Sequence, residues 1–170
     1  MKKIFLLLSI IGAFTFSSCT VNDDDGHDND TISEVFIVDN VNFIASGDFQ
    51  AIIPLNPKIY ASDVILVYRW AGVNALGNDI WEPIPTSYSF DNGDELKYFF
   101  DYSVDDVVVY LESNFDPMLR QDFSLNQSIK IAIVPGYFST TVDTSNHDAV
   151  MSALKDLNGG VSMPVEKIRL

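Results

Sequence analysis

From Glu34 onward, apolar residues fall into short alternating runs bounded by Gly, Pro, Asn or Asp. Side chains of a β-strand point alternately to its two faces, so this pattern predicts strands joined by turns. Seven or eight strands are expected, because the segments at 78–81 and 87–90 bracket prolines and are typical of an edge strand or a loop. The candidate strands lie at 35–44, 49–55, 63–70, 78–81, 87–90, 96–102, 107–111, 129–133 and 165–170.

The segment from Asp63 to Trp70 is nearly continuous in apolar residues. One of its faces carries the alternate positions from Val64 to Trp70, and the opposite face carries Ile65 and Val67. Apolar residues on both faces predict a central strand that is covered on both sides.

The clearest turn signal is Asn92-Gly93, which separates two alternating segments. Asn-Gly supplies the positive φ angles of a tight type I′ turn, so the flanking segments are expected to form a hairpin. An alternative interpretation, in which the acidic turn residues bind a metal ion, concerns Asp91, Asp94 and Glu95. The hairpin interpretation is favoured because turns select the same residue types.

Near the end of the chain the apolar spacing becomes helical, at Val150, Met151, Leu154 and Leu157. Capping oxygens precede this segment at residues 144–146, and Gly159-Gly160 follows it, so one helix of about twelve residues is predicted. The fold class expected for residues 34–170 is mainly β: an antiparallel two-sheet β-sandwich-like domain with one C-terminal α-helix.

Residues 1–18 have the pattern of a cleaved signal peptide, with two lysines near the start, an apolar stretch at 4–16 and two serines before Cys19. The apolar stretch is too short to span a bilayer comfortably as a permanent helix. A cysteine directly after small residues resembles the lipobox of bacterial lipoproteins, although Phe16 stands where that motif prefers Leu, Val or Ile. The resemblance implies that Cys19 becomes the lipid-modified (palmitate-bearing) N-terminus, so that the lipid attaches the protein to a membrane.

Residues 19–33 are rich in Asp and have no apolar periodicity, which predicts a disordered acidic tether. Acids directly behind a lipidated cysteine resemble the export signal of Bacteroidetes lipoproteins, which implies location on the cell-surface face of the outer membrane. The triplet from Asp30 to Ile32 resembles the short O-glycosylation motif of the same phylum and makes Thr31 a candidate acceptor. An EF-hand is excluded, because counting back from Gly26 places Val21 at its first ligand position.

The chain has 24 acidic and ten basic residues, and removal of the leader leaves eight of the basic ones. An acidic surface repels phosphate backbones, and no basic patch occurs in the domain, so nucleic acid is excluded as a partner. The single Cys rules out an intramolecular disulfide, a redox pair or a Cys-based zinc site.

The domain contains no sequence signature of catalysis. Its one histidine, His147, falls in the first turn of the predicted helix and is interpreted as an exposed polar residue. Nucleophile elbows, dinucleotide fingerprints and phosphate loops do not occur. We therefore expect no catalytic residues, no metal and no cofactor.

Exposed aromatic rings are the remaining candidates for ligand contact, as in carbohydrate-binding sandwiches. Tyr68 and Trp70 share the face of an expected buried strand and are assigned to the core. Trp81 and Tyr88 lie beside prolines on an expected edge, which makes them candidates for stacking on a ligand.

Segments over most of residues 34–136 resemble a family of small, uncharacterised flavobacterial lipoproteins. These segments are Glu34-Val35-Phe36 to Asn42-Phe43, Pro54-Leu55-Asn56-Pro57, Val67-Tyr68-Arg69, Asp79-Ile80-Trp81, Phe90-Asp91-Asn92-Gly93 and Ile131-Ala132-Ile133-Val134-Pro135-Gly136. Some members carry the label dihydrolipoamide dehydrogenase, but that enzyme needs a flavin-binding fold and a cysteine pair, which this sequence lacks. Two function classes remain: a non-catalytic binding or structural envelope module with a glycan or protein ligand, and a carboxylate-dependent or accessory protein for polysaccharide binding and use.

Overall fold

The computed structural model describes residues 33–170. The expected leader, Cys19, Thr31 and nearly all of the expected tether lie outside these residues. In residues 33–170, no helix is long and apolar enough to cross a membrane.

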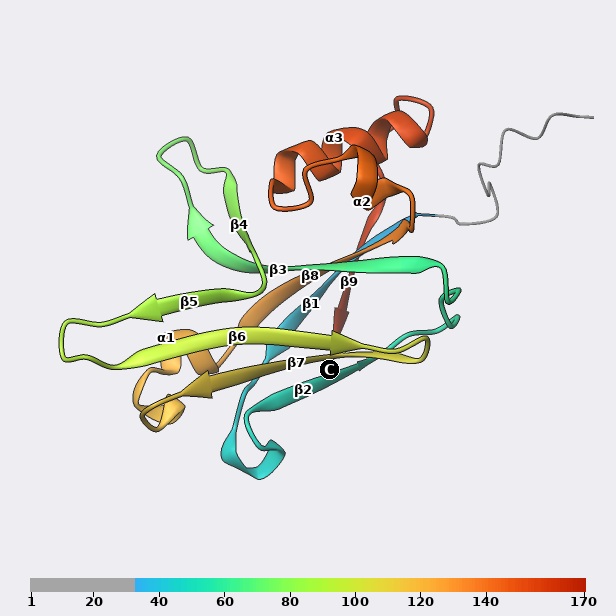
Figure 1. Cartoon of the computed structure of the whole chain (residues 1–170). Coiled ribbons are helices and arrows are strands. Elements are labelled where there is room, and N and C mark those ends of the chain that lie inside the picture. The colour runs from blue at the N-terminus through green and yellow to red at the C-terminus, as the bar shows by residue number, and fades with distance from the viewer. Residues whose placement is uncertain (1–32) are drawn as a thin grey trace, which may run out of the picture.

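Two β-sheets pack face to face, which confirms a mainly β, sandwich-like fold (Figure 1). The first sheet has five strands in the order β4-β3-β8-β1-β9. Its strands are β1 (Glu34–Val41), β3 (Asp63–Val73), β4 (Asp79–Pro83), β8 (Gln127–Pro135) and β9 (Val165–Arg169). All pairs in it are antiparallel except β1 and β9, which run parallel.

The second sheet has four strands in the order β2-β7-β6-β5, and all of its pairs are antiparallel. Its strands are β2 (Gln50–Pro54), β5 (Thr86–Ser89), β6 (Glu95–Tyr102) and β7 (Asp106–Ser113). Consequently β4 and β5, the segments beside the prolines, are edge strands of the two sheets; the sequence had left an edge strand and a loop open for them. The opposite edges are formed by β9 and β2.

The main core fills the space between the sheets and is built from the inward positions of each strand. Ile65 and Val67 of β3 belong to it, whereas Val64 and Leu66 pack on the outer side of the same sheet, as the alternation predicted. The assignment of Trp70 to the core was wrong. Its side chain is 39% exposed, because the chain bulges after Trp70 where β3 leaves β8 and pairs only with β4.

The outer side of the first sheet is covered by α3 (His147–Leu157) and the short α2 (Phe138–Thr141) (Figure 1). The Asn146 side chain caps α3 by accepting from the backbone N–H groups of Asp148 and Ala149. Val150 and Leu154 lie on the face of α3 that packs on the sheet and are fully buried, whereas Leu157 is exposed. The predicted helix is therefore confirmed, with an apolar face that ends one turn early.

The predicted hairpin joins β5 to β6, but its turn is not of type I′. Gly93 has a φ of 86°, and Asn92 has no positive φ. Gly93 N donates to Phe90 O, and Phe90 N donates to Asp94 O. This is a three-residue loop with Gly in the left-handed position, which needs only one positive φ angle.

Shorter helical elements connect the strands. They are η1 (Ala45–Gly47), η2 (Pro117–Leu119) and α1 (Gln121–Ser124). The segment with η2 and α1 lies at one end of the sandwich, between β7 and β8, and the apolar pattern did not predict it.

Candidate functional site

A groove opens at one side of the sandwich, between the edge strands β9 and β2. It consists of a narrow chamber of about 180 Å³ and a wider one of about 500 Å³. Both chambers are lined by Glu34, Pro57 and Ile133, so they form one continuous groove. The wider chamber alone has the size of a small-molecule site.

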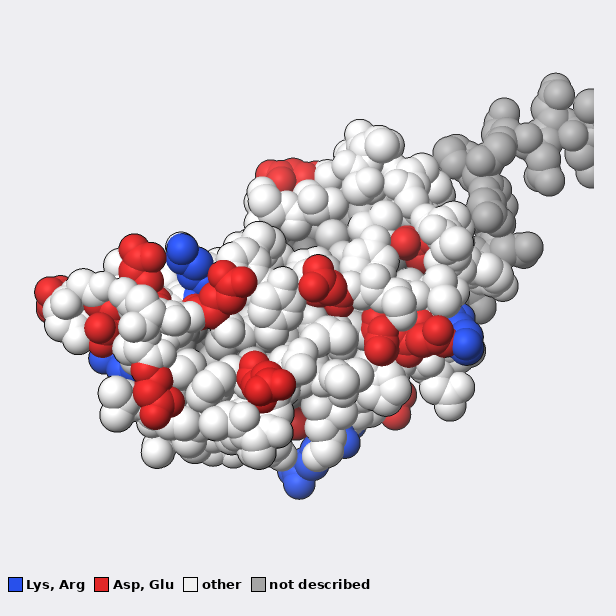
Figure 2. All heavy atoms as spheres, turned by 60° about the horizontal axis from the view of Figure 1, so that its bottom comes forward, with Lys and Arg blue, Asp and Glu red and all other residues white. Residues whose placement is uncertain are grey.

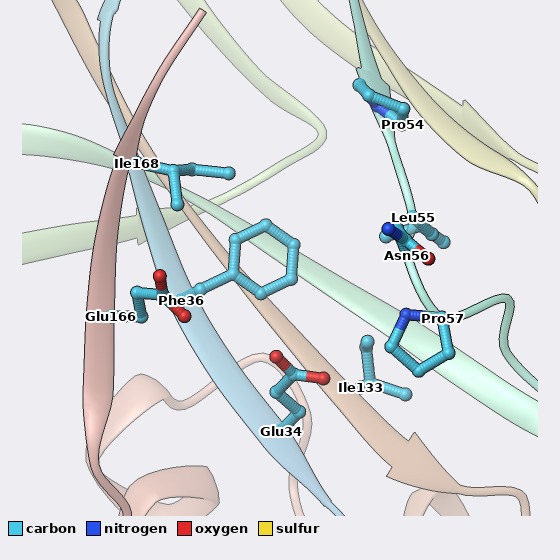
Figure 3. A pocket seen from close by; sticks show the side chains of 9 residues that line it. All are labelled: Glu34, Phe36, Pro54, Leu55, Asn56, Pro57, Ile133, Glu166 and Ile168. Atoms are coloured by element: carbon cyan, nitrogen blue, oxygen red, sulfur yellow. The ribbon is translucent and has the colours of Figure 1, made fainter.

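One wall of the narrow chamber comes from the inward faces of β1 and β9. Glu34 and Phe36 are two residues apart on β1 and therefore share a face. The parallel register places Glu166 of β9 beside Phe36, and Ile168 follows on the same face. Figure 3 shows both carboxylates on the β1–β9 side of the chamber, with the Phe36 ring between Glu34 and Ile168.

The opposite wall is formed by Pro54, the last residue of β2, and by the segment that follows it as far as Pro57 (Figure 3). Leu55 N donates to Asp105 O at 2.8 Å, and Ile59 N donates to Val104 O at 3.1 Å. These bonds fix the segment to the turn between β6 and β7. The groove is therefore bounded on both sides by hydrogen-bonded backbone, which keeps its walls apart.

The wider chamber is mostly apolar. Its lining includes Ile59, Tyr60, Met163 and Pro164, and the Tyr60 side chain is 60% exposed. No local pattern in the sequence indicated this site, because its residues come from four separate segments that only the folded topology brings together.

A buried carboxylate belongs to the lining of the wider chamber. Asp63, at the start of β3, is only 6% exposed. Its Oδ2 accepts a hydrogen bond from Tyr60 N at 2.9 Å. Its Oδ1 is buried and has no hydrogen-bond partner among residues 33–170. Buried polar atoms are rarely left without partners, so this oxygen marks a place where a donor is missing.

A second polar cluster lies on the outer face of the first sheet, beneath the start of α3. Lys130 of β8 is buried, its Nζ lies 2.9 Å from Nε2 of His147, and the same Nζ lies 3.9 Å from the centre of the Trp81 ring. Nδ1 of His147 faces the Asp148 carboxylate at 3.1 Å. The interpretation of His147 as an exposed residue was wrong, because its side chain is only 16% exposed.

Burial is the main cause of the pKa shifts in this cluster. Burial lowers the pKa of Lys130 to about 8, although Asp79 and Asp148 act in the opposite direction. Burial and the Lys130 ammonium lower the pKa of His147. A charged Lys130 donates only, so neutral His147 accepts at Nε2 and carries its proton on Nδ1. With Lys130 charged and His147 neutral, the hydrogen bond between them holds the start of α3 against the sheet.

A third polar cluster surrounds Arg69, which is 7% exposed at the β4–β5 end of the core. Its guanidinium donates to the hydroxyls of Tyr88 and Tyr98 and to Oε1 of Gln127. The Tyr98 hydroxyl donates in turn to Phe123 O, so the network also holds α1. Burial raises the pKa of Tyr98 well above its usual value. Nη2 donates to Asp122 O at 3.4 Å, so each nitrogen of the guanidinium has a partner, which indicates a structural role.

The residues that the sequence suggested for stacking have partners within the chain. Trp81 stacks on His147 at 6.3 Å between ring centres and contacts Lys130. The Tyr88 hydroxyl donates to the Glu82 carboxylate, and its ring packs on Phe123. Both side chains are only partly exposed, and ligand stacking on them stays a prediction.

Metal ligation is not favoured in the described part of the chain. No group of three or more His, Cys, Asp or Glu residues gathers there in a way that could hold a metal ion. Asp91, Asp94 and Glu95 do not form such a group, and Asn92 instead donates to Asp94 within the turn.

Comparison of the chain with protein-family models, with curated proteins and with solved structures finds no match.

Proposed function

We propose that the protein is a lipid-anchored, extracytoplasmic envelope lipoprotein whose β domain binds a ligand in the β9–β2 groove and performs no catalysis. The groove carries this proposal. Apolar walls with a few fixed polar groups are the usual composition of a ligand site, and the combined chambers have the volume for one.

The chemistry of the other clusters supports binding over catalysis. A general base or nucleophile must reach its substrate. His147 and Lys130 are the groups best suited to that work, and both are engaged beneath α3 and absent from the lining of the groove.

Anchoring is proposed from the leader and from Cys19, which follows two small residues. Several acyl chains hold a protein on a membrane far more firmly than one chain does. Glu34, the first residue of β1, lines the groove, so the ligand site lies at the end of the domain to which the tether would attach.

The anchoring is tested by mass spectrometry of the mature full-length protein and by protease treatment of intact cells. We expect an acylated Cys19 at the N-terminus and loss of the protein from intact cells after protease treatment. Cys19→Ala should leave the protein unlipidated, whereas Ser18→Ala, which keeps a small residue, should not. An unmodified N-terminus at another residue would refute the anchor.

A second candidate is an accessory role in polysaccharide binding, which the exposed ring of Tyr60 in the wider chamber favours. Aromatic faces that are open to solvent can stack on sugar rings. A glycan panel tests this role: it is favoured if Tyr60→Ala abolishes binding and Tyr102→Ala, at an exposed ring that lines neither chamber, leaves binding intact.

A further inference from the structure

Two carboxylates of the groove, those of Glu34 and Glu166, lie on neighbouring strands, and neither has a basic partner among the described residues. Glu34 is two residues from Phe36, which pairs with Glu166, so the two acids are diagonal neighbours on one face of β1 and β9. Like charges at such positions repel each other. Among the described residues, neither acid takes part in a salt bridge.

The basic residues near the groove have other partners. Lys58 lines the wider chamber, but its ammonium is paired with Asp105. Lys167 follows Glu166 on β9 and therefore points to the other face of the sheet, where it lies 3.9 Å from Asp39. The negative potential of the groove is thus left uncompensated, and the chain's net charge of −14 adds to it. Figure 2 shows a face on which Asp and Glu outnumber Lys and Arg.

The buried Asp63 adds an independent observation. A carboxylate oxygen that is buried without a donor carries the full cost of its lost hydration. Asp63 belongs to the lining of the wider chamber, so its negative charge adds to that of the groove, although Oδ1 itself is closed to solvent. The site is thus matched to a cation.

Apolar surface separates the acidic positions. Phe36, Ile133 and Pro57 lie along the narrow chamber, and Ile59 and Met163 continue the apolar lining in the wider one. The carboxylates do not gather into a group that could hold a metal ion. Methylene chains bury favourably on such surface. A ligand that suits this lining has several cationic groups joined by thin apolar segments.

We propose that the groove binds a linear aliphatic polyamine, with its ammonium groups at Glu34, Glu166 and Asp63 and its methylene segments on the apolar walls. This inference rests on the proposed binding role of the groove and names its ligand class. The narrow chamber, about 180 Å³, favours a free polyamine over a peptide, whose backbone is bulkier than a methylene chain.

The test is calorimetric titration of the full-length lipoprotein in neutral detergent with spermidine. We expect binding of one spermidine per chain. Binding should be at least about tenfold weaker in Asp63→Asn, which loses a negative charge of the groove, and in the double variant Glu34→Gln/Glu166→Gln, which loses charge-assisted hydrogen bonds. Glu112→Gln removes the same charge from an exposed position on β7, outside the groove, and should bind as the parent does.

Controls separate the groove from general attraction to an acidic protein. The neutral 1,8-octanediol should not bind, and Mg²⁺ should not displace spermidine at equal ionic strength. The double variant changes surface side chains, so it tests the site even if Asp63→Asn fails to fold, which thermal unfolding will reveal.

Equal weakening by Glu112→Gln, or unchanged binding by the groove variants, would overturn the proposal. So would binding only of an acetylated and amidated lysine peptide, which would assign the groove to a protein partner. A chain that is acylated at Cys19 and displayed on cells but does not bind spermidine would lose the ligand class alone, since its anchor is measured separately.

Discussion

Arg69 is a positive charge inside a sandwich core, and its neighbours explain how the fold tolerates it. Three side-chain oxygens accept from the guanidinium, and the Tyr88, Tyr98 and Phe123 rings lie within 5.4 Å of it. Buried charges persist only when they are paired and hydrogen-bonded in this way. The network therefore joins β3, β5, β6 and α1 through a single residue.

Replacing Arg69 should cost more than the loss of one contact. We expect Arg69→Met to lower the free energy of unfolding by about 3 kcal/mol, because several buried hydroxyl and amide groups lose their donor together. Chemical denaturation measures the change. Arg169→Met, at an exposed position of β9, should leave stability nearly unchanged, and a similar loss in both variants would contradict the structural role.

His147 gives the fold a dependence on pH. Its pKa is lowered in the folded chain, so on acidification the unfolded chain takes up the proton first, near the ordinary pKa of 6.5. Stability is therefore fully present above that pH and falls as the pH drops toward the folded pKa. Lys130, with its pKa lowered to about 8, acts in the same direction between pH 10.5 and 8.

We expect the free energy of unfolding to be lower at pH 5.5 than at pH 7.5, and the difference to be smaller in His147→Gln. His27→Gln, at the other histidine of the chain, provides the matched control and should keep the parent's difference. An identical pH response in all three proteins would show that the imidazole beneath α3 is not the titrating group.

At the scale of single elements, the β5–β6 hairpin depends on one backbone angle. Gly93 has a φ of 86°, and a Cβ built there would meet no atom within 4 Å. The cost of Gly93→Ala is therefore conformational, and we expect a loss of about 1 kcal/mol in unfolding free energy. Gly47→Ala, where space is equally open and φ is not positive, should be neutral or slightly stabilising.

The local sequence predicted most strands, because the residues that face the core are apolar and recur at every second position of a strand. The alternation of β3 identified its two faces correctly except at Trp70, and the prolines beside β4 and β5 indicated an edge strand or a loop. The position of Lys130 could not be predicted in this way. In the sequence Lys130 occupies a polar position of an alternating strand, which predicts exposure. It is buried only because α3 packs over that face of the sheet.

The groove was beyond sequence reasoning for a related physical reason. Its wall requires β9 to pair parallel to β1, and that register joins residues more than a hundred positions apart. Alternation within the segment 165–170 predicted a strand, but it carries no information about which neighbour the strand selects. Glu166 therefore looked like any exposed acid.

For the molecule as a whole, we expect stability to be independent of divalent metal. Structural metal sites contribute their binding energy to folding, so a fold that contains one loses stability in a chelator. The melting temperature of the full chain should be the same with and without EDTA. A large drop in melting temperature that Ca²⁺ reverses would contradict this expectation and would indicate a calcium site with Asp91, Asp94 and Glu95 as candidate ligands.

The position of β1 has a mechanical consequence. This strand lies inside its sheet, hydrogen-bonded to β8 on one side and to β9 on the other. A force applied to the chain ahead of Glu34 acts along the strand and loads both rows of hydrogen bonds at once. An edge strand would instead yield on one side only. If the tether transmits drag from the surroundings of a cell, the domain is pulled in a direction in which its sheet resists by shear.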